Sequence, residues 1–100
     1  MSAELLIHYK KRLTDRMFKE IKVWRLSEPV AGSAHLYKYR LALVADGQCV
    51  LRYDNERGKG DHRHQGDQEC PLPWHGIASL LADFDREIER WRQRNEFIDH

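Results

Sequence analysis

The sequence is poor in cysteine and has no long apolar run. Cys49 and Cys70 are its only cysteines, and their spacing matches no short metal-binding motif, which argues against a disulfide framework and against a cysteine-rich zinc module. No stretch approaches the roughly 20 apolar residues that a membrane-spanning helix needs, and no apolar export segment opens the chain. We therefore expect a cytoplasmic protein that has free thiols and does not enter a membrane.

Neither sign of charge dominates overall, but the charges are unevenly distributed. The net charge is +1, with nine Lys or Arg against four Asp or Glu in residues 1–45 and eight against twelve in residues 46–100. The basic first half is a weak indication of an anionic partner. A length of 100 residues suits one compact core, so we expect a single domain over residues 1–100.

Short segments with strand-like composition predict four strands. They cover residues 3–11, 17–26, 36–44 and 49–53. A helix is predicted over residues 75–95, where apolar side chains recur at helical spacing. Its apolar stripe consists of Ile77, Leu80, Leu81, Phe84, Ile88 and Trp91. We expect an α+β fold in which a small, mostly antiparallel four-stranded meander carries a C-terminal helix packed on one face.

The turn between the third and fourth strands decides which of their side chains share a face. A two-residue turn and a three-residue turn both fit the sequence ADGQ, and they shift the strand pairing by one position. We favour the three-residue turn, 45–47, because it pairs Leu41 with Leu51 and keeps the apolar side chains together. The opposite face then carries the cations Lys38, Arg40 and Arg52. Arg40 faces Arg52 directly in this register, which calls for a carboxylate or a phosphate between them.

Residues 52–69, RYDNERGKGDHRHQGDQE, concentrate cations, histidines and glycines in one segment. We interpret the segment as a glycine-hinged loop after the fourth strand, where a scaffold commonly presents its working residues. Histidine can move protons near neutral pH, and arginine can bind phosphate through a bidentate fork. These residue types together indicate cleavage of a phosphodiester by acid–base chemistry without a metal.

The candidate site residues fall into three groups. The catalytic candidates are His62 and His64 as acid and base, Arg57, Lys59 and Arg63 as groups that stabilise the phosphate, and Asp61 as a group that orients a histidine. The candidates for binding RNA or phosphate are Lys38, Arg40, Arg52 and, by stacking on a base, Tyr53. The candidate loop-organising residues are Asp54, Asn55, Gly58 and Gly60.

Other interpretations of residues 52–69 are open. His62 and His64 could bind a metal with Asp61 or His75, but no second tight pair of ligands accompanies them, so we expect neither a metal nor a cofactor. The sequence GKGD lacks the spacing of a P-loop. Composition alone favours a charged surface loop, because four cations and five acids within the segment can pair with one another.

Several segments resemble the TumE-type toxin family of prokaryotic type II toxin–antitoxin systems. The resemblance rests on KYRL (38–41) and YDNERGKGDHRH (53–64), and it continues in AELLIHYKK, VWRLSEPVAGSAHLYKYRL and LLADFDREI. It thus extends along most of the chain. It implies a small toxin that is held inactive in a complex with an antitoxin encoded beside it, and this antitoxin usually carries a DNA-binding domain.

We therefore expect a toxin that acts on RNA, with free RNA or the ribosome as its target, and that cleaves RNA without a metal through the 53–64 loop. The first alternative is a toxin that binds a protein target without catalysis. The second is a nucleotide-dependent modifying transferase in which GKG faces a nucleotide phosphate. Exposed strand edges also allow pairing with an antitoxin segment or a homodimer.

Overall fold

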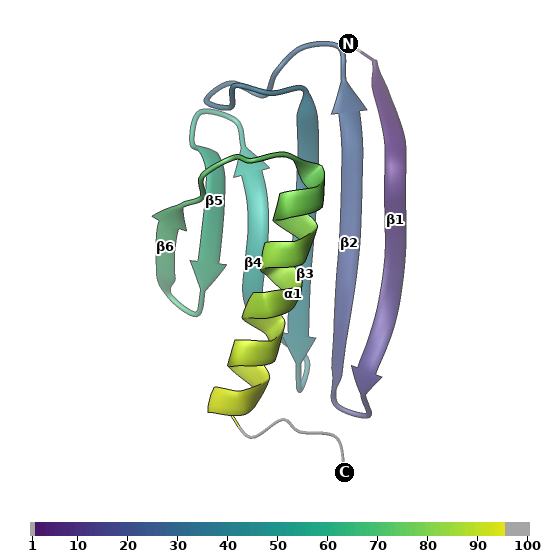
Figure 1. The fold of residues 1–100 in the computed structure, drawn as a ribbon, viewed down its shortest axis with the longest axis vertical. Helices are drawn as coiled ribbons and strands as arrows, with labels where there is room; N and C mark the ends of the chain where they lie inside the picture. The colour runs from purple at the N-terminus through teal and green to yellow at the C-terminus, as the bar shows by residue number, and fades with distance from the viewer. Residues whose placement is uncertain (1, 96–100) are drawn as a thin grey trace.

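The computed structural model describes residues 2–95 as an antiparallel sheet with one helix on one of its faces (Figure 1). The elements are β1 (Ala3–Thr14), β2 (Met17–Leu26), β3 (Tyr37–Ala45), β4 (Gln48–Glu56), β5 (Gly60–Gln65), β6 (Gln68–Pro71) and α1 (Ile77–Arg94). The strands follow one another across the sheet in chain order, which confirms the predicted α+β meander with a C-terminal helix. Residues 1 and 96–100 of the predicted domain lie outside the described residues.

The sheet has six strands rather than the predicted four, because residues 52–69 do not form a loop. β4 continues to Glu56, residues 57–59 make a turn, and β5 pairs with both β4 and β6. β5 has the sequence GDHRHQ and contains no apolar side chain, so a search for hydrophobic alternation could not find it. Backbone hydrogen bonding to two neighbouring strands, and not side-chain pattern, makes this segment a strand.

The turn between β3 and β4 is the two-residue turn, at Asp46 and Gly47, so the predicted three-residue turn is wrong. Both residues have a positive φ, 51° and 78°, as a type I′ hairpin turn requires. The register then shifts between Leu43 and Val44, because β4 contains one extra residue at a bulge. Beyond the bulge Leu43 pairs with Leu51, so the apolar side chains still share a face.

The bulge also changes which charged residues meet across β3 and β4. Arg40 pairs with Asp54, and Arg52 pairs with Ala42. The predicted direct pairing of Arg40 with Arg52 is therefore wrong. A carboxylate on the neighbouring strand already lies opposite the Arg40 cation, so no phosphate is needed to relieve a repulsion.

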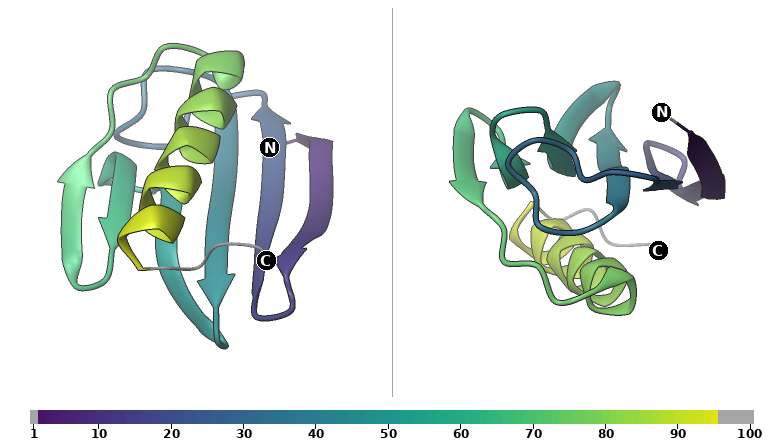
Figure 2. Two further views of the ribbon diagram at one scale, coloured as in Figure 1. Left: turned by 60° about the horizontal axis from the view of Figure 1, so that its bottom comes forward. Right: turned by 90° about the horizontal axis from the view of Figure 1, so that it is seen from above.

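The core lies between α1 and the face of the sheet that the helix crosses (Figures 1 and 2). The helix contributes Leu80, Phe84, Ile88 and Trp91, which confirms the predicted apolar stripe, and the sheet contributes Met17, Ile21, Val23, Tyr39, Leu41, Leu43, Ala45, Leu51 and Tyr53. Lys19 lies at the margin of this face, where its Nζ donates to Oδ1 of Asp85 on α1 at 2.8 Å. No helix within residues 2–95 has the length and apolar character needed to cross a membrane.

The long connection between β2 and β3, residues 27–36, packs against the β4–β5 turn. The backbone N–H of Gly58 donates to the carbonyl of Ala31 at 2.6 Å. Gly32 and Gly60 approach so closely that a Cβ built on Gly60 would lie 2.5 Å from the carbonyl oxygen of Gly32. Glycine at both positions lets the connection pack closely against the first residue of β5.

Substitution of Gly60 tests this contact, with Gly58 as a matched control. Both residues have a positive φ, +74° and +85°, but a Cβ on Gly58 would meet nothing within 4 Å. We expect Gly58→Ala to lower the free energy of unfolding by about 1 kcal/mol through backbone strain. Gly60→Ala adds a backbone clash and should cost about 2 kcal/mol more. Urea unfolding measures both values, and equal losses would contradict the close packing.

Candidate functional site

Alternate residues of β4 and β5 point away from α1, onto the open face of the sheet. Side chains alternate along a strand, and Tyr53 and Arg63 contact Phe84 and Glu87 on the helix, so their neighbours face the other way. Cross-strand pairing places Arg52 opposite His64 and Asp54 opposite His62. We use the name open-face cluster for Arg40, Arg52, Asp54, Glu56, His62, His64 and Glu69.

Each histidine of the open-face cluster has one ring nitrogen held by the sheet. Nδ1 of His62 lies 3.1 Å from the carbonyl oxygen of Gly60, and Nε2 of His64 lies 3.2 Å from Oδ1 of Asp54. A carbonyl or a carboxylate oxygen can only accept, so these two nitrogens carry hydrogen. The other nitrogen, Nε2 of His62 and Nδ1 of His64, carries a lone pair when its ring is neutral and a hydrogen when the ring is protonated.

Nε2 of His62 and Nδ1 of His64 both face one carboxylate, that of Glu69 on β6. Its oxygens lie 3.6 Å from Nε2 of His62 and 3.9 Å from Nδ1 of His64. Nζ of Lys59 is 3.7 Å from the same group. These distances are longer than hydrogen bonds. When the imidazoles are protonated, they and the ammonium group surround a position suited to an anion.

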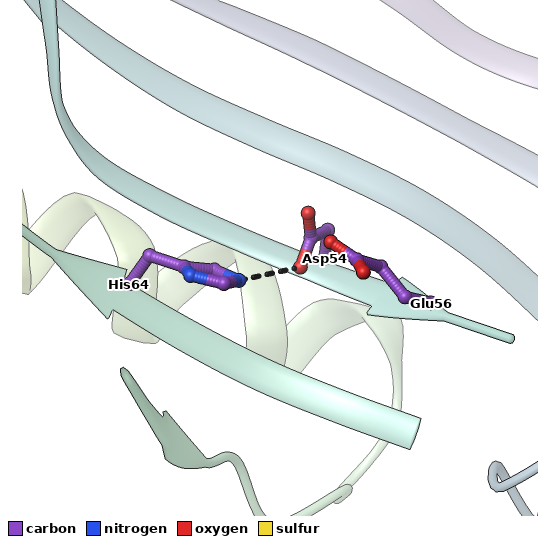
Figure 3. Close-up of side chains that lie close together, drawn as sticks. All are labelled: Asp54, Glu56 and His64. Carbon is purple, nitrogen blue, oxygen red and sulfur yellow. Dashed lines mark hydrogen bonds and ion pairs between the residues drawn. The ribbon is translucent and has the colours of Figure 1, made fainter. Parts of the chain in front are cut away.

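Asp54, Glu56 and His64 carry ligand types found at metal sites, and one ligand atom from each lies within 4.8 Å of the others (Figure 3). Arg52 occupies the same place, with Nε 2.9 Å from Oδ2 of Asp54 and Nη2 3.8 Å from Oε1 of Glu56. A guanidinium keeps its charge in a protein, so both carboxylates already have a cation. A metal ion would have to displace Arg52, and the arrangement suits an ion-pair network better than a metal centre.

Asp61 does hold a histidine, but that histidine is His35 and lies on the helix side of the sheet. Oδ1 of Asp61 accepts from Nε2 of His35 at 2.8 Å and from the hydroxyl of Tyr39 at 2.7 Å. The His35 ring stacks on Trp74 with 3.5 Å between ring centroids. Asp61 is thus separated from His62 and His64 by the sheet, because it alternates with them along β5.

Arg63 and Tyr53 also lie on the helix side. Nη2 of Arg63 donates to Oε2 of Glu87 at 3.0 Å. Tyr53 is 2% exposed, and its ring packs edge-on against Phe84. Neither side chain reaches the open face, so base stacking by Tyr53 and phosphate stabilisation by Arg63 do not fit this arrangement.

The remaining candidates are divided between the turn and the sheet. Arg57 and Gly58 lie in the exposed turn before β5, and Lys38 is exposed on β3. Asn55 is buried on the helix side, where its Oδ1 accepts from the Tyr39 N–H at 3.0 Å and its Nδ2 donates to the Tyr37 carbonyl at 2.7 Å. Asn55 therefore organises backbone, as expected. The backbone that it binds is that of β3, and not that of the predicted loop.

Asp54 has a different role from the expected organisation of a loop. It lies within β4, is 8% exposed, and its carboxylate contacts Arg52 and His64. These contacts place Asp54 beside the acid–base candidates rather than among the structural residues.

Glu56, Glu69 and His35 are important neighbours that the sequence interpretation did not assign. Glu56 follows Asp54 by two residues, so extending the fourth strand would have placed it on the same face. Glu69 could be located only after β6 was known to pair with β5. No sequence signal marks His35, which lies in an irregular connection.

The comparisons with known proteins identify the family. A family model described as Toxin TumE matches residues 2–92. The chain therefore belongs to the TumE toxin family, which confirms the resemblance seen in the sequence, and it is a toxin of a toxin–antitoxin system with a cognate antitoxin as its partner. Comparison with curated proteins and with solved structures gives no match.

The buried tyrosines predict how stability changes at high pH. Burial, followed by the negative charge of Glu87, raises the pKa of Tyr53 to about 12, and burial with the Asp61 hydrogen bond raises the pKa of Tyr39 well above its usual range. Because the unfolded chain loses these protons first, the stabilisation is complete below pH 10 and declines as pH rises from there toward 12.

We expect Tyr53→Phe to reduce this decline by about 1.4 kcal/mol per pH unit between pH 10 and 12. Urea unfolding at several pH values measures the slope. Tyr9→Phe is the matched control, because Tyr9 is 44% exposed and lies on the edge strand. The same decline in Tyr53→Phe as in the unsubstituted chain would contradict the assignment.

Proposed function

We propose that this toxin cleaves RNA without a metal and that the open-face cluster is the active site. The observation that carries the proposal is the anion position between His62, His64 and Lys59, which the Glu69 carboxylate marks. A phosphodiester, like a carboxylate, carries its negative charge on two terminal oxygens, and at this position it would meet the same three groups. Two imidazoles on either side of a phosphate are a suitable acid–base pair for its transesterification.

The two histidines are suited to different steps. His62 is oriented by a neutral carbonyl, and its Nε2 takes the proton from the ribose 2′-hydroxyl as O2′ bonds to phosphorus. The Asp54 carboxylate offsets the charge of a protonated His64, so Nδ1 of this ring donates its proton to O5′ as the P–O5′ bond breaks. The products are a 2′,3′-cyclic phosphate and a free 5′-hydroxyl, and the enzyme is left with the protons exchanged.

The cations at the edge of the cluster bind the rest of the RNA backbone in this proposal. The Arg40 side chain is 45% exposed, and its contact with Glu20 is loose, with Nη1 3.9 Å from the carboxylate. Its guanidinium can therefore turn to bind a phosphate. Lys38 lies one alternation further along β3 and is exposed. Arg52 is held by Asp54 and Glu56 and fixes the position of Asp54 rather than that of the substrate.

Replacing the two histidines tests the proposal. We expect His62→Ala and His64→Ala each to lower the rate of RNA cleavage by roughly 100-fold or more, because each removes a proton-transfer group. The measurement follows end-labelled RNA in the presence of EDTA, together with growth during controlled expression. His8→Ala is the matched control. His8 lies on the same face of the sheet, but on β1, where it is close to Glu20 of β2 and outside the open-face cluster.

Several outcomes would contradict cleavage by this cluster. Growth arrest with intact RNA would identify a toxin that binds a protein target. Retention of a nucleotide with a labelled, modified target would identify a transferase. Cleavage that EDTA abolishes and a divalent cation restores would assign Asp54, Glu56 and His64 to a metal instead.

Glu69 provides a second test, because its carboxylate occupies the position proposed for the phosphate. We expect Glu69→Gln to strengthen RNA binding several-fold by removing a competing negative charge. Asp67→Asn is the matched control, since Asp67 is an exposed acid in the adjacent β5–β6 turn. Filter binding to a labelled RNA measures both variants. An equal effect of the two would show that only the net charge matters, and that the anion position is not the binding site.

A further inference from the structure

β1 is a long edge strand with an exposed apolar surface. It has 12 residues, and it pairs with β2 alone. Leu5, Leu6 and Tyr9 are 52%, 45% and 44% exposed, and within residues 2–95 they are the large apolar side chains with the greatest exposure. The opposite edge, β6, has four residues and ends at Pro71, as protected edges commonly do. The two edges are therefore not equivalent.

The helix does not protect β1. Figures 1 and 2 show α1 over the middle of the sheet and β1 at the margin away from the helix. Unpaired backbone groups along a strand of this length attract another strand. A 12-residue edge left free is therefore a surface suited to β-strand addition.

The C-terminal half of β1 is basic. Lys10, Lys11 and Arg12 follow one another and are exposed. Nζ of Lys10 lies 4.1 Å from the ring centroid of Phe18, and within residues 2–95 no carboxylate pairs with Lys11 or Arg12. A hollow of about 650 Å³ beside this half is lined by residues that include the cations Lys10, Arg12 and Arg16 and the acids Asp15 and Asp46, and Arg16 pairs with Asp46. This half is complementary to acidic side chains.

A second copy of the chain fits this edge poorly. Between Leu5 and Ile7 the register against β2 shifts, so side chains before and after the bulge alternate out of phase. If two copies of β1 paired antiparallel about a two-fold axis, each strand would contain this bulge. Side chains of the two strands could then not stay on matching faces along their whole length. Within the regular stretch from Ile7 to Arg12, such pairing would bring His8, Lys10 and Arg12 of the two copies together.

We infer that the β1 edge binds an extended strand of the cognate antitoxin. That strand presents apolar side chains beside Ile7 and Tyr9 and acidic side chains beside Lys10, Lys11 and Arg12. The inference rests on the toxin part of the proposed function and not on RNA cleavage. Failure of the cleavage experiment therefore leaves it standing, and its own failure leaves the active-site proposal standing.

Calorimetric titration with the antitoxin encoded beside this chain tests the inference. We expect Lys11→Glu/Arg12→Glu to weaken binding by about tenfold or more, because two attractive contacts become repulsive. The matched control is Arg90→Glu/Arg94→Glu, which makes the same change of charge at exposed positions on α1 and should alter affinity by no more than about twofold. Far-UV circular dichroism verifies that both variants remain folded.

Amide hydrogen exchange of the unsubstituted chain, alone and with the antitoxin, locates the interface. We expect the amides of β1 to gain protection when the antitoxin binds. Protection confined to β6 or α1 would overturn the inference, as would equal loss of affinity in the two double variants. A dimer of the chain alone, with β1 amides already protected, would assign the edge to a second copy and would also overturn it.

Discussion

The antiparallel pairing of β5 with β4 is the interaction that assembles the open-face cluster. This pairing takes a segment without apolar residues and divides its side chains between two environments. His62 and His64 face the open side, while Asp61 and Arg63 face the helix side and are neutralised by contacts there. Because side chains alternate along a strand, a run of mixed charges is divided into an open face that carries the two histidines and a set of structural contacts on the helix side.

Charge compensation determines what the open face can do. The Arg52 guanidinium is shared by Asp54 and Glu56, so an otherwise acidic group of ligands carries a permanent cation and Asp54 remains available to orient His64. The other histidine nitrogens lie near the Glu69 carboxylate of β6, whose side chain is 35% exposed against 11% for that of Asp54. In the active-site proposal, a phosphate takes the place of this carboxylate. The active-site proposal rests on this balance, which suits an anion better than a metal ion.

The structural contacts on the helix side keep the hairpin in place. Asn55 and Asp61 bind groups of β3 and of the connection that precedes it, and Gly32 and Gly60 allow that connection to approach the start of β5. Asn55 and Asp61 are as polar as the residues of the active-site proposal, yet their side chains are bound to groups on the helix side of the sheet. Polarity alone therefore does not separate the two sets, and the direction of each side chain does.

The class of fold, the apolar stripe of α1 and the family could all be predicted from the sequence, because hydrophobic periodicity and a long motif are local properties of the chain. The two-residue spacing of His62 and His64 places them on one face only because β5 is a strand. Three features could not be predicted in this way: β5 and β6 are strands, a bulge sets Asp54 opposite Arg40, and Glu69 lies near the histidines. These features arise from backbone pairing between segments, and a polar strand carries no periodic signal from which such pairing can be read.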